Sequence, residues 1–133
     1  MFKPIFFIPF FFLVSLQIQA QNSTISTEVE EVRSFGRWET SEQIGYYRLI
    51  IKQYGYEHVK NTVSIQWIVE SRNGPNLLQT IPISEVNEPN IYAIGIEEID
   101  GKIIKLNLTD TYTLEDSQIE ISVGLPGKYY KID

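Results

Sequence analysis

The sequence predicts an all-β protein, a small antiparallel β-sandwich of about seven or eight strands. Apolar residues recur at every second position over several short stretches, and turn-forming residues separate these stretches within about 100 residues. No window holds a 3.6-residue apolar repeat over three helical turns. A small closed β-barrel is the alternative, because the same alternation of strands and turns also fits a barrel.

The N-terminal half of the domain contains four expected strands. They are Val32–Glu39, Ile44–Tyr54, Val63–Val69 and Leu77–Ser84. In the third of them, Val, Ile, Trp and Val occupy alternate positions, which is the pattern of a strand with one face buried. The fourth contains Pro82, which has no amide donor, so we expect that strand at a sheet edge.

The C-terminal half contains four more expected strands, Ile91–Glu98, Lys102–Leu114, Gln118–Leu125 and Lys128–Ile132. The first two are expected to form a hairpin. A three-residue loop with Gly101 in the left-handed conformation pairs Ile96 with Ile104 and keeps the apolar side chains on one face. A two-residue Asp100–Gly101 turn mixes polar and apolar residues on both faces, so we expect the three-residue loop.

The first 20 residues have the layout of a secretory signal peptide. Lys3 precedes an apolar run from Ile5 to Leu16, and Ala20 offers a small residue for cleavage. The run is shorter than the ~20 residues that a membrane-spanning helix needs. We therefore expect an exported protein, secreted or periplasmic, without stable membrane insertion after cleavage. A flexible polar leader, residues 21–31, then precedes a single β domain over residues 32–133.

The charge of the chain makes some partners improbable. The full sequence has 11 basic and 17 acidic residues, and Lys3 is the only charged residue that cleavage after Ala20 removes, which leaves a net charge of −7. Such a surface repels phosphate groups, so nucleic acid and anionic membranes are not expected partners. The sequence does not predict the oligomeric state.

The chain contains no cysteine and a single histidine, His58. Zinc–thiolate sites, iron–sulfur clusters and thiol nucleophiles are therefore excluded, and we expect no metal and no other cofactor. His58 and Glu57 are adjacent in sequence and point to opposite faces in extended backbone, which argues against a catalytic dyad. Gly55 lies between two β-rich runs, so we interpret the segment as a turn.

Carboxylates offer little more support for an enzyme. The adjacent pairs Glu30/Glu31, Glu97/Glu98 and Glu115/Asp116 are typical of surface charge, although a carboxylate-dependent hydrolase is kept as an alternative function. Asp110, Glu115 and Asp116 lack the ligand spacing of a calcium loop. We therefore expect no catalytic residues and a protein that is not an enzyme.

Gly36-Arg37-Trp38 resembles the Gly-x-Trp that opens the first strand of lipocalins. The resemblance covers three residues, and the chain expected after cleavage is shorter than members of that family and has no evident C-terminal helix. It implies a barrel that encloses a small apolar ligand, so a lipocalin-like small-ligand carrier is another alternative function.

Consecutive tyrosines indicate a binding surface, because only one of two adjacent strand residues can face the core. Tyr129 and Tyr130 form one such pair, and Tyr46 and Tyr47 form the other. With Tyr47, Leu49 and Ile51 inward, the opposite face carries the predicted binding residues Tyr46, Arg48, Lys52 and Tyr54, close to Tyr56 and His58. Tyrosine and arginine are enriched at protein interfaces.

The leading functional hypothesis is thus an exported, non-enzymatic binding protein. It recognises a protein or a glycan through this aromatic and basic strand face, for example as an inhibitor or an immunity-type protein. The identity of the partner does not follow from the sequence.

Overall fold

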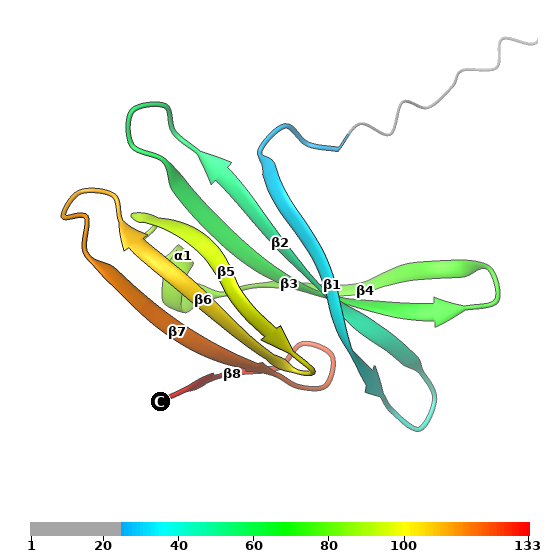
Figure 1. The fold of residues 1–133 in the computed structure, drawn as a ribbon. Helices are drawn as coiled ribbons and strands as arrows, with labels where there is room; N and C mark the ends of the chain where they lie inside the picture. Colours follow the sequence, from blue (N-terminus) through cyan, green and yellow to red (C-terminus); the bar gives the residue numbers. More distant parts are fainter. Residues whose placement is uncertain (1–24) are drawn as a thin grey trace, which may run out of the picture.

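A computed structural model describes residues 25–133, which form two antiparallel four-stranded sheets (Figure 1). The first sheet has the order β1-β2-β3-β4 and the second the order β5-β6-β7-β8, so neighbours in the chain are neighbours in each sheet. The elements are β1 (Val29–Glu39), β2 (Ile44–Tyr54), β3 (Lys60–Ser71), β4 (Gly74–Pro82), α1 (Ser84–Asn87), β5 (Tyr92–Asp100), β6 (Ile103–Asp110), β7 (Asp116–Val123) and β8 (Tyr129–Ile132).

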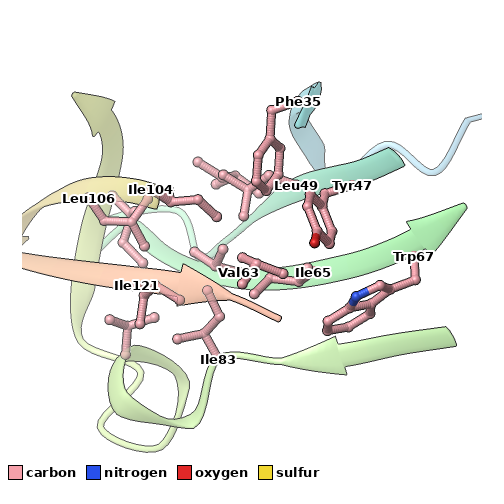
Figure 2. Close-up of a cluster of buried hydrophobic side chains, with 14 of the residues drawn as sticks. Phe35, Tyr47, Leu49, Val63, Ile65, Trp67, Ile83, Ile104, Leu106 and Ile121 are labelled. Atoms are coloured by element: carbon pink, nitrogen blue, oxygen red, sulfur yellow. The ribbon is translucent and has the colours of Figure 1, made fainter. Parts of the chain in front are cut away.

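The prediction of a small β-sandwich is confirmed, and the barrel alternative is wrong. The two sheets are separate and open, and each has two edge strands. The inward side chains of both sheets fill the space between them (Figure 2). Trp38, Tyr47 and Trp67 are the largest of the fully buried side chains. The core is therefore a packed interface between two layers and does not have the architecture of a ligand-enclosing barrel.

Most of the expected strands lie where the alternation places them. β2 has the predicted bounds, and β4, which contains Pro82, is an edge strand as predicted. β1 begins at Val29, three residues before its expected start, because Val29 pairs with Lys52 of β2. Residues 1–24, which include the predicted signal peptide and the first four residues of the predicted leader, lie outside the described residues. The last three residues of that leader, 29–31, belong to β1.

The predicted register of the β5–β6 hairpin is wrong by two residues. Ile96 pairs with Leu106 rather than Ile104, and the turn has two residues, Gly101 and Lys102. A β-bulge at Glu97 adds one residue to β5. With this extra residue, Ile96 lies opposite the apolar Leu106 even though the turn has only two residues. Gly101 has the predicted left-handed conformation, with φ of 56°.

Gly36-Arg37-Trp38 has a structural explanation that requires no barrel. Gly36 is the extra residue of a β-bulge in β1, with φ of 45°. A Cβ at Gly36 would lie 2.1 Å from the carbonyl oxygen of Gly101, so the absence of a side chain lets the β5–β6 turn approach β1. Trp38 is buried in the core and donates its indole N–H to the carbonyl oxygen of Tyr46 at 3.2 Å.

The two sheets are also joined by polar contacts. Asn61 of β3 is 2% exposed, and its side-chain oxygen accepts the backbone N–H of Ile94 in β5 at 2.7 Å. Tyr129 of β8 accepts the backbone N–H of Ser84 at 3.1 Å and donates to Glu85 at 2.8 Å, which connects β8 to α1. These contacts fix the second sheet relative to the first.

α1, the short helix at Ser84–Asn87, was not expected from the sequence. Its four residues are too few to produce a 3.6-residue apolar repeat. Across residues 25–133, no helix is both long enough and apolar enough to cross a membrane.

Candidate functional site

The outer face of β2 carries four of the six predicted binding residues. Tyr47, Leu49 and Ile51 are buried in the core, as predicted. The alternate residues of the same strand, Tyr46, Arg48, Lys52 and Tyr54, therefore point away from the core on one face. Ile50 lies between them on the same face and was not among the predicted residues. At ~3.3 Å per residue, this row extends over ~26 Å.

The middle of the row is tied to the sheet. The Arg48 guanidinium donates to the side-chain oxygen of Gln66 at 2.8 Å, and the Gln66 amide donates to the Thr80 hydroxyl at 3.2 Å. This chain of hydrogen bonds crosses β2, β3 and β4. Because Gln66 occupies one N–H donor of Arg48, fewer hydrogen-bond donors of this side chain remain for a partner, while its positive charge is retained.

Tyr46 is half-buried near a bidentate ion pair. It lies between Arg37 of β1 and Ile68 of β3 in the register of the sheet. Arg37 donates to the two carboxylate oxygens of Glu70 at 2.6 and 3.2 Å. The hydrogen bond and the charge of Glu70 raise the pKa of Arg37 above its ordinary value. This end of the row is thus internally paired.

The other end of the row is much more exposed. Tyr54 is 41% exposed, and Tyr56, in the loop between β2 and β3, is 98% exposed. His58 belongs to the same loop, and its ring stacks on that of Tyr112 with a centroid distance of 5.0 Å and an interplanar angle of 28°. The histidine therefore contacts an aromatic ring of the second sheet.

Tyr112 lies in the loop between β6 and β7. One carboxylate oxygen of Asp110 accepts the backbone N–H groups of Tyr112 and Thr113 at 2.8 and 3.0 Å. These bonds lower the pKa of Asp110 below its ordinary value. Leu114 has a left-handed backbone with φ of 61° and is 76% exposed. The loop thus has a defined turn conformation and presents apolar side chains to solvent.

We call the exposed end the loop tip and define it by Tyr54, Tyr56, His58, Tyr112 and Leu114. Figure 1 shows the β2–β3 and β6–β7 turns at the same end of the sandwich, and the contact between His58 and Tyr112 joins them. The structure thus brings Tyr54, Tyr56 and His58 together at this end, whereas Tyr46 and Arg48 lie farther along the strand. Tyr112 was not predicted, since only the stacking of the sheets places it beside His58. Leu114, two residues farther along the same loop, was not predicted either.

Four of the candidate acids have structural partners. Asp116 accepts the Thr109 hydroxyl at 2.6 Å, and Glu30 accepts the Asn61 side-chain amide at 3.0 Å. Glu31 pairs with Arg33, and Glu97 accepts the side-chain amide of Gln118. Among residues 25–133, no group of three or more histidine, aspartate or glutamate side chains is placed to hold a metal ion.

Two hollows lie on the surface, away from the loop tip. One, of about 470 Å3, is lined by Arg37, Trp38, Glu39, Ile44 and Lys102. The other, of about 200 Å3, is lined by Asp100, Ile103, Lys105 and Glu120. Both are open, and both combine charged and apolar side chains, unlike the enclosed apolar cavity that a lipocalin-like carrier requires.

Comparison of the chain with models of protein families, with curated protein sequences and with solved structures found no match.

Proposed function

We propose that the protein is an exported, non-enzymatic binding protein that recognises a protein or a glycan through the loop tip and the adjoining outer face of β2. The observation that carries this proposal is the convergence of exposed aromatic side chains from two loops. Tyr56 is 98% exposed and Tyr112 is 59% exposed, and both belong to the loops that the His58–Tyr112 contact joins.

The physical chemistry of these side chains supports binding. A tyrosine offers a large contact area with few rotatable bonds, so its immobilisation by a partner costs little conformational entropy. Burial of its ring removes apolar area from water, at about 25 cal/mol per Å2, and its hydroxyl remains available for a hydrogen bond. Exposed tyrosines serve equally for stacking on sugar rings, which is why both partner classes belong to the proposal.

The scaffold favours a preorganised site. The loops are held by the hydrogen bonds of Asp110 and by the stacked ring pair, and they extend from strands of two packed sheets. A site that is already ordered before binding loses less entropy on association. An inhibitor or immunity-type protein, which uses a rigid surface to block another protein, fits this arrangement.

Site-specific photocrosslinking tests the proposed surface. Tyr56 and Tyr112 are each replaced with p-benzoylphenylalanine, and the proteins are irradiated with periplasmic or culture fractions of the source cells. Tyr130 of β8, which is 61% exposed and pairs with Ser122 near the opposite end of β7, provides the matched control. We expect a shared crosslinked species from positions 56 and 112 and none from position 130. Equal crosslinking at all three positions contradicts the proposal.

Export has a separate test. The proposal includes cleavage after Ala20, so N-terminal sequencing of the protein recovered outside the cytoplasm should begin at Gln21. Recovery of the uncleaved chain from the cytoplasm alone contradicts this part of the proposal and leaves the binding surface unaffected.

A further inference from the structure

The charge around the loop tip differs from the charge on the sheet faces. Residues 54–60 and 110–116, which contain its two loops, carry four carboxylates and one lysine. None of these four carboxylates takes part in an ion pair within residues 25–133. The sheet faces, by contrast, pair their charges, with Arg37 on Glu70 at 2.6 Å and Lys105 on Glu120 at 3.5 Å.

The four carboxylates have two different roles. Asp110 and Asp116 are engaged by groups of their own loop, through the backbone N–H groups of Tyr112 and Thr113 and the hydroxyl of Thr109. Glu57 and Glu115 are exposed and accept no hydrogen bond from any side chain of the described chain. Glu57 follows Tyr56 and Glu115 follows Leu114 in the sequence, so free negative charge adjoins two of the most exposed apolar side chains.

We propose that the loop tip docks on a lysine- and arginine-rich surface of a partner protein. This inference rests on the proposed function and chooses the partner class. The positive groups of such a surface pair with Glu57 and Glu115, and they stack on the exposed faces of Tyr56 and Tyr112, because cations are attracted to aromatic rings. A neutral glycan offers hydroxyl donors to the carboxylates but no opposite charge, and an anionic glycan is repelled by them.

A peptide selection tests the charge of the partner. A phage library of random 12-residue peptides is selected on the immobilised protein at low ionic strength, after depletion on the Tyr56→Ala/Tyr112→Ala variant. We expect the selected peptides to be enriched about twofold or more in lysine and arginine over the starting library. Their affinity should fall about tenfold between 50 and 500 mM NaCl, because salt screens exposed charges.

Two variants test whether the carboxylate charge contributes to binding. Glu57→Gln/Glu115→Gln should weaken the selected peptides about fivefold, since each exposed charge pair contributes a small part of the affinity. The Tyr130→Ala control should leave their affinity unchanged. Peptides that carry no excess positive charge, or that bind the double glutamine variant as tightly as the wild type, overturn the inference but leave the proposed surface intact.

The remaining outcomes are also decisive. Chitohexaose, a neutral glycan, is titrated in parallel, and its binding is measured by isothermal titration calorimetry. Chitohexaose binding that Tyr56→Ala abolishes assigns the surface to a glycan, which overturns the inference and supports the proposed function. Failure to obtain any peptide or glycan binding that depends on Tyr56 or Tyr112 counts against both.

Discussion

Tyr47 and Trp67, from neighbouring strands of the first sheet, donate hydrogen bonds to one acceptor, the backbone carbonyl of Gly124 beyond β7 of the second sheet. The phenol oxygen of Tyr47 lies 3.2 Å from this carbonyl oxygen, and the indole nitrogen of Trp67 lies 3.1 Å from it. The two rings meet edge to face, with centroids 6.3 Å apart and an interplanar angle of 83°. The polar atoms of two buried aromatic residues are thereby satisfied, and the sheets are joined.

Tyr47→Phe should lower the free energy of unfolding by about 0.5–1.5 kcal/mol. The substitution removes one hydrogen bond, while Trp67 continues to satisfy the Gly124 carbonyl. Urea denaturation measures the change, and Tyr46→Phe is the control, because the Tyr46 hydroxyl makes no hydrogen bond within the described chain. A loss for Tyr46→Phe that equals the loss for Tyr47→Phe contradicts this role of the buried phenol.

Asn61→Ala should cost about 1–3 kcal/mol, because the buried amide of Ile94 loses its acceptor. Hydrogen exchange at the Ile94 amide should accelerate more than exchange elsewhere in β5. Asn73→Ala is the matched control, since Asn73 is exposed and should change stability by no more than about 0.5 kcal/mol. Unchanged protection of Ile94 in the Asn61 variant argues against the inter-sheet bond.

Gly36→Ala and Gly101→Ala separate steric overlap from backbone strain. Both glycines have positive φ, 45° and 56°, so each alanine incurs strain of about 1–3 kcal/mol. Only the Cβ at position 36 meets another atom, the Gly101 carbonyl oxygen at 2.1 Å, whereas no atom lies within 4 Å of a Cβ at position 101. Thermal unfolding should therefore show the larger loss for Gly36→Ala. The reverse order contradicts the close approach of the turn to β1.

The conformation of the β6–β7 loop should depend on pH through Asp110. Because its pKa in the folded protein is lowered from an ordinary value of 3.8, its stabilising contribution is present above pH 3.8. That contribution is lost as the pH falls through the lower folded-state pKa. The amide NMR shifts of Tyr112 and Thr113 should report a midpoint below 3.8, and Asp110→Asn should remove the transition. A midpoint at or above 3.8 would show that the two amides do not stabilise the carboxylate.

The alternation of apolar residues was sufficient to predict which face of each main strand is buried. It identified Tyr47, Leu49 and Ile51 as core residues, and Pro82 identified the edge strand. It did not identify the register of the β5–β6 hairpin. On the side of the bulge away from the turn, the observed register differs from the predicted one by two residues, which leaves those side chains on the same face. The alternation therefore does not distinguish the two registers there.

The loop tip was only partly predictable for a related reason. Tyr54, Tyr56 and His58 are close together in the sequence and were selected together. The contact between His58 and Tyr112 depends on how the two sheets stack, and no local sequence pattern predicts it. The partial pairing of the strand face was also missed, because the hydrogen bond between Arg48 and Gln66 joins two strands and depends on their register.

The measurement that tests the binding surface most directly is quantitative partner retention by three purified forms of the exported protein. Wild type, Tyr56→Ala/Tyr112→Ala and Tyr130→Ala are immobilised at equal density, and the species crosslinked through position 56 is quantified in each eluate by mass spectrometry. We predict that the double variant retains at least about tenfold less of this species than the wild type, while Tyr130→Ala retains the wild-type amount. Equal retention by the double variant, at unchanged circular dichroism, would contradict the assignment of the loop tip as the binding surface.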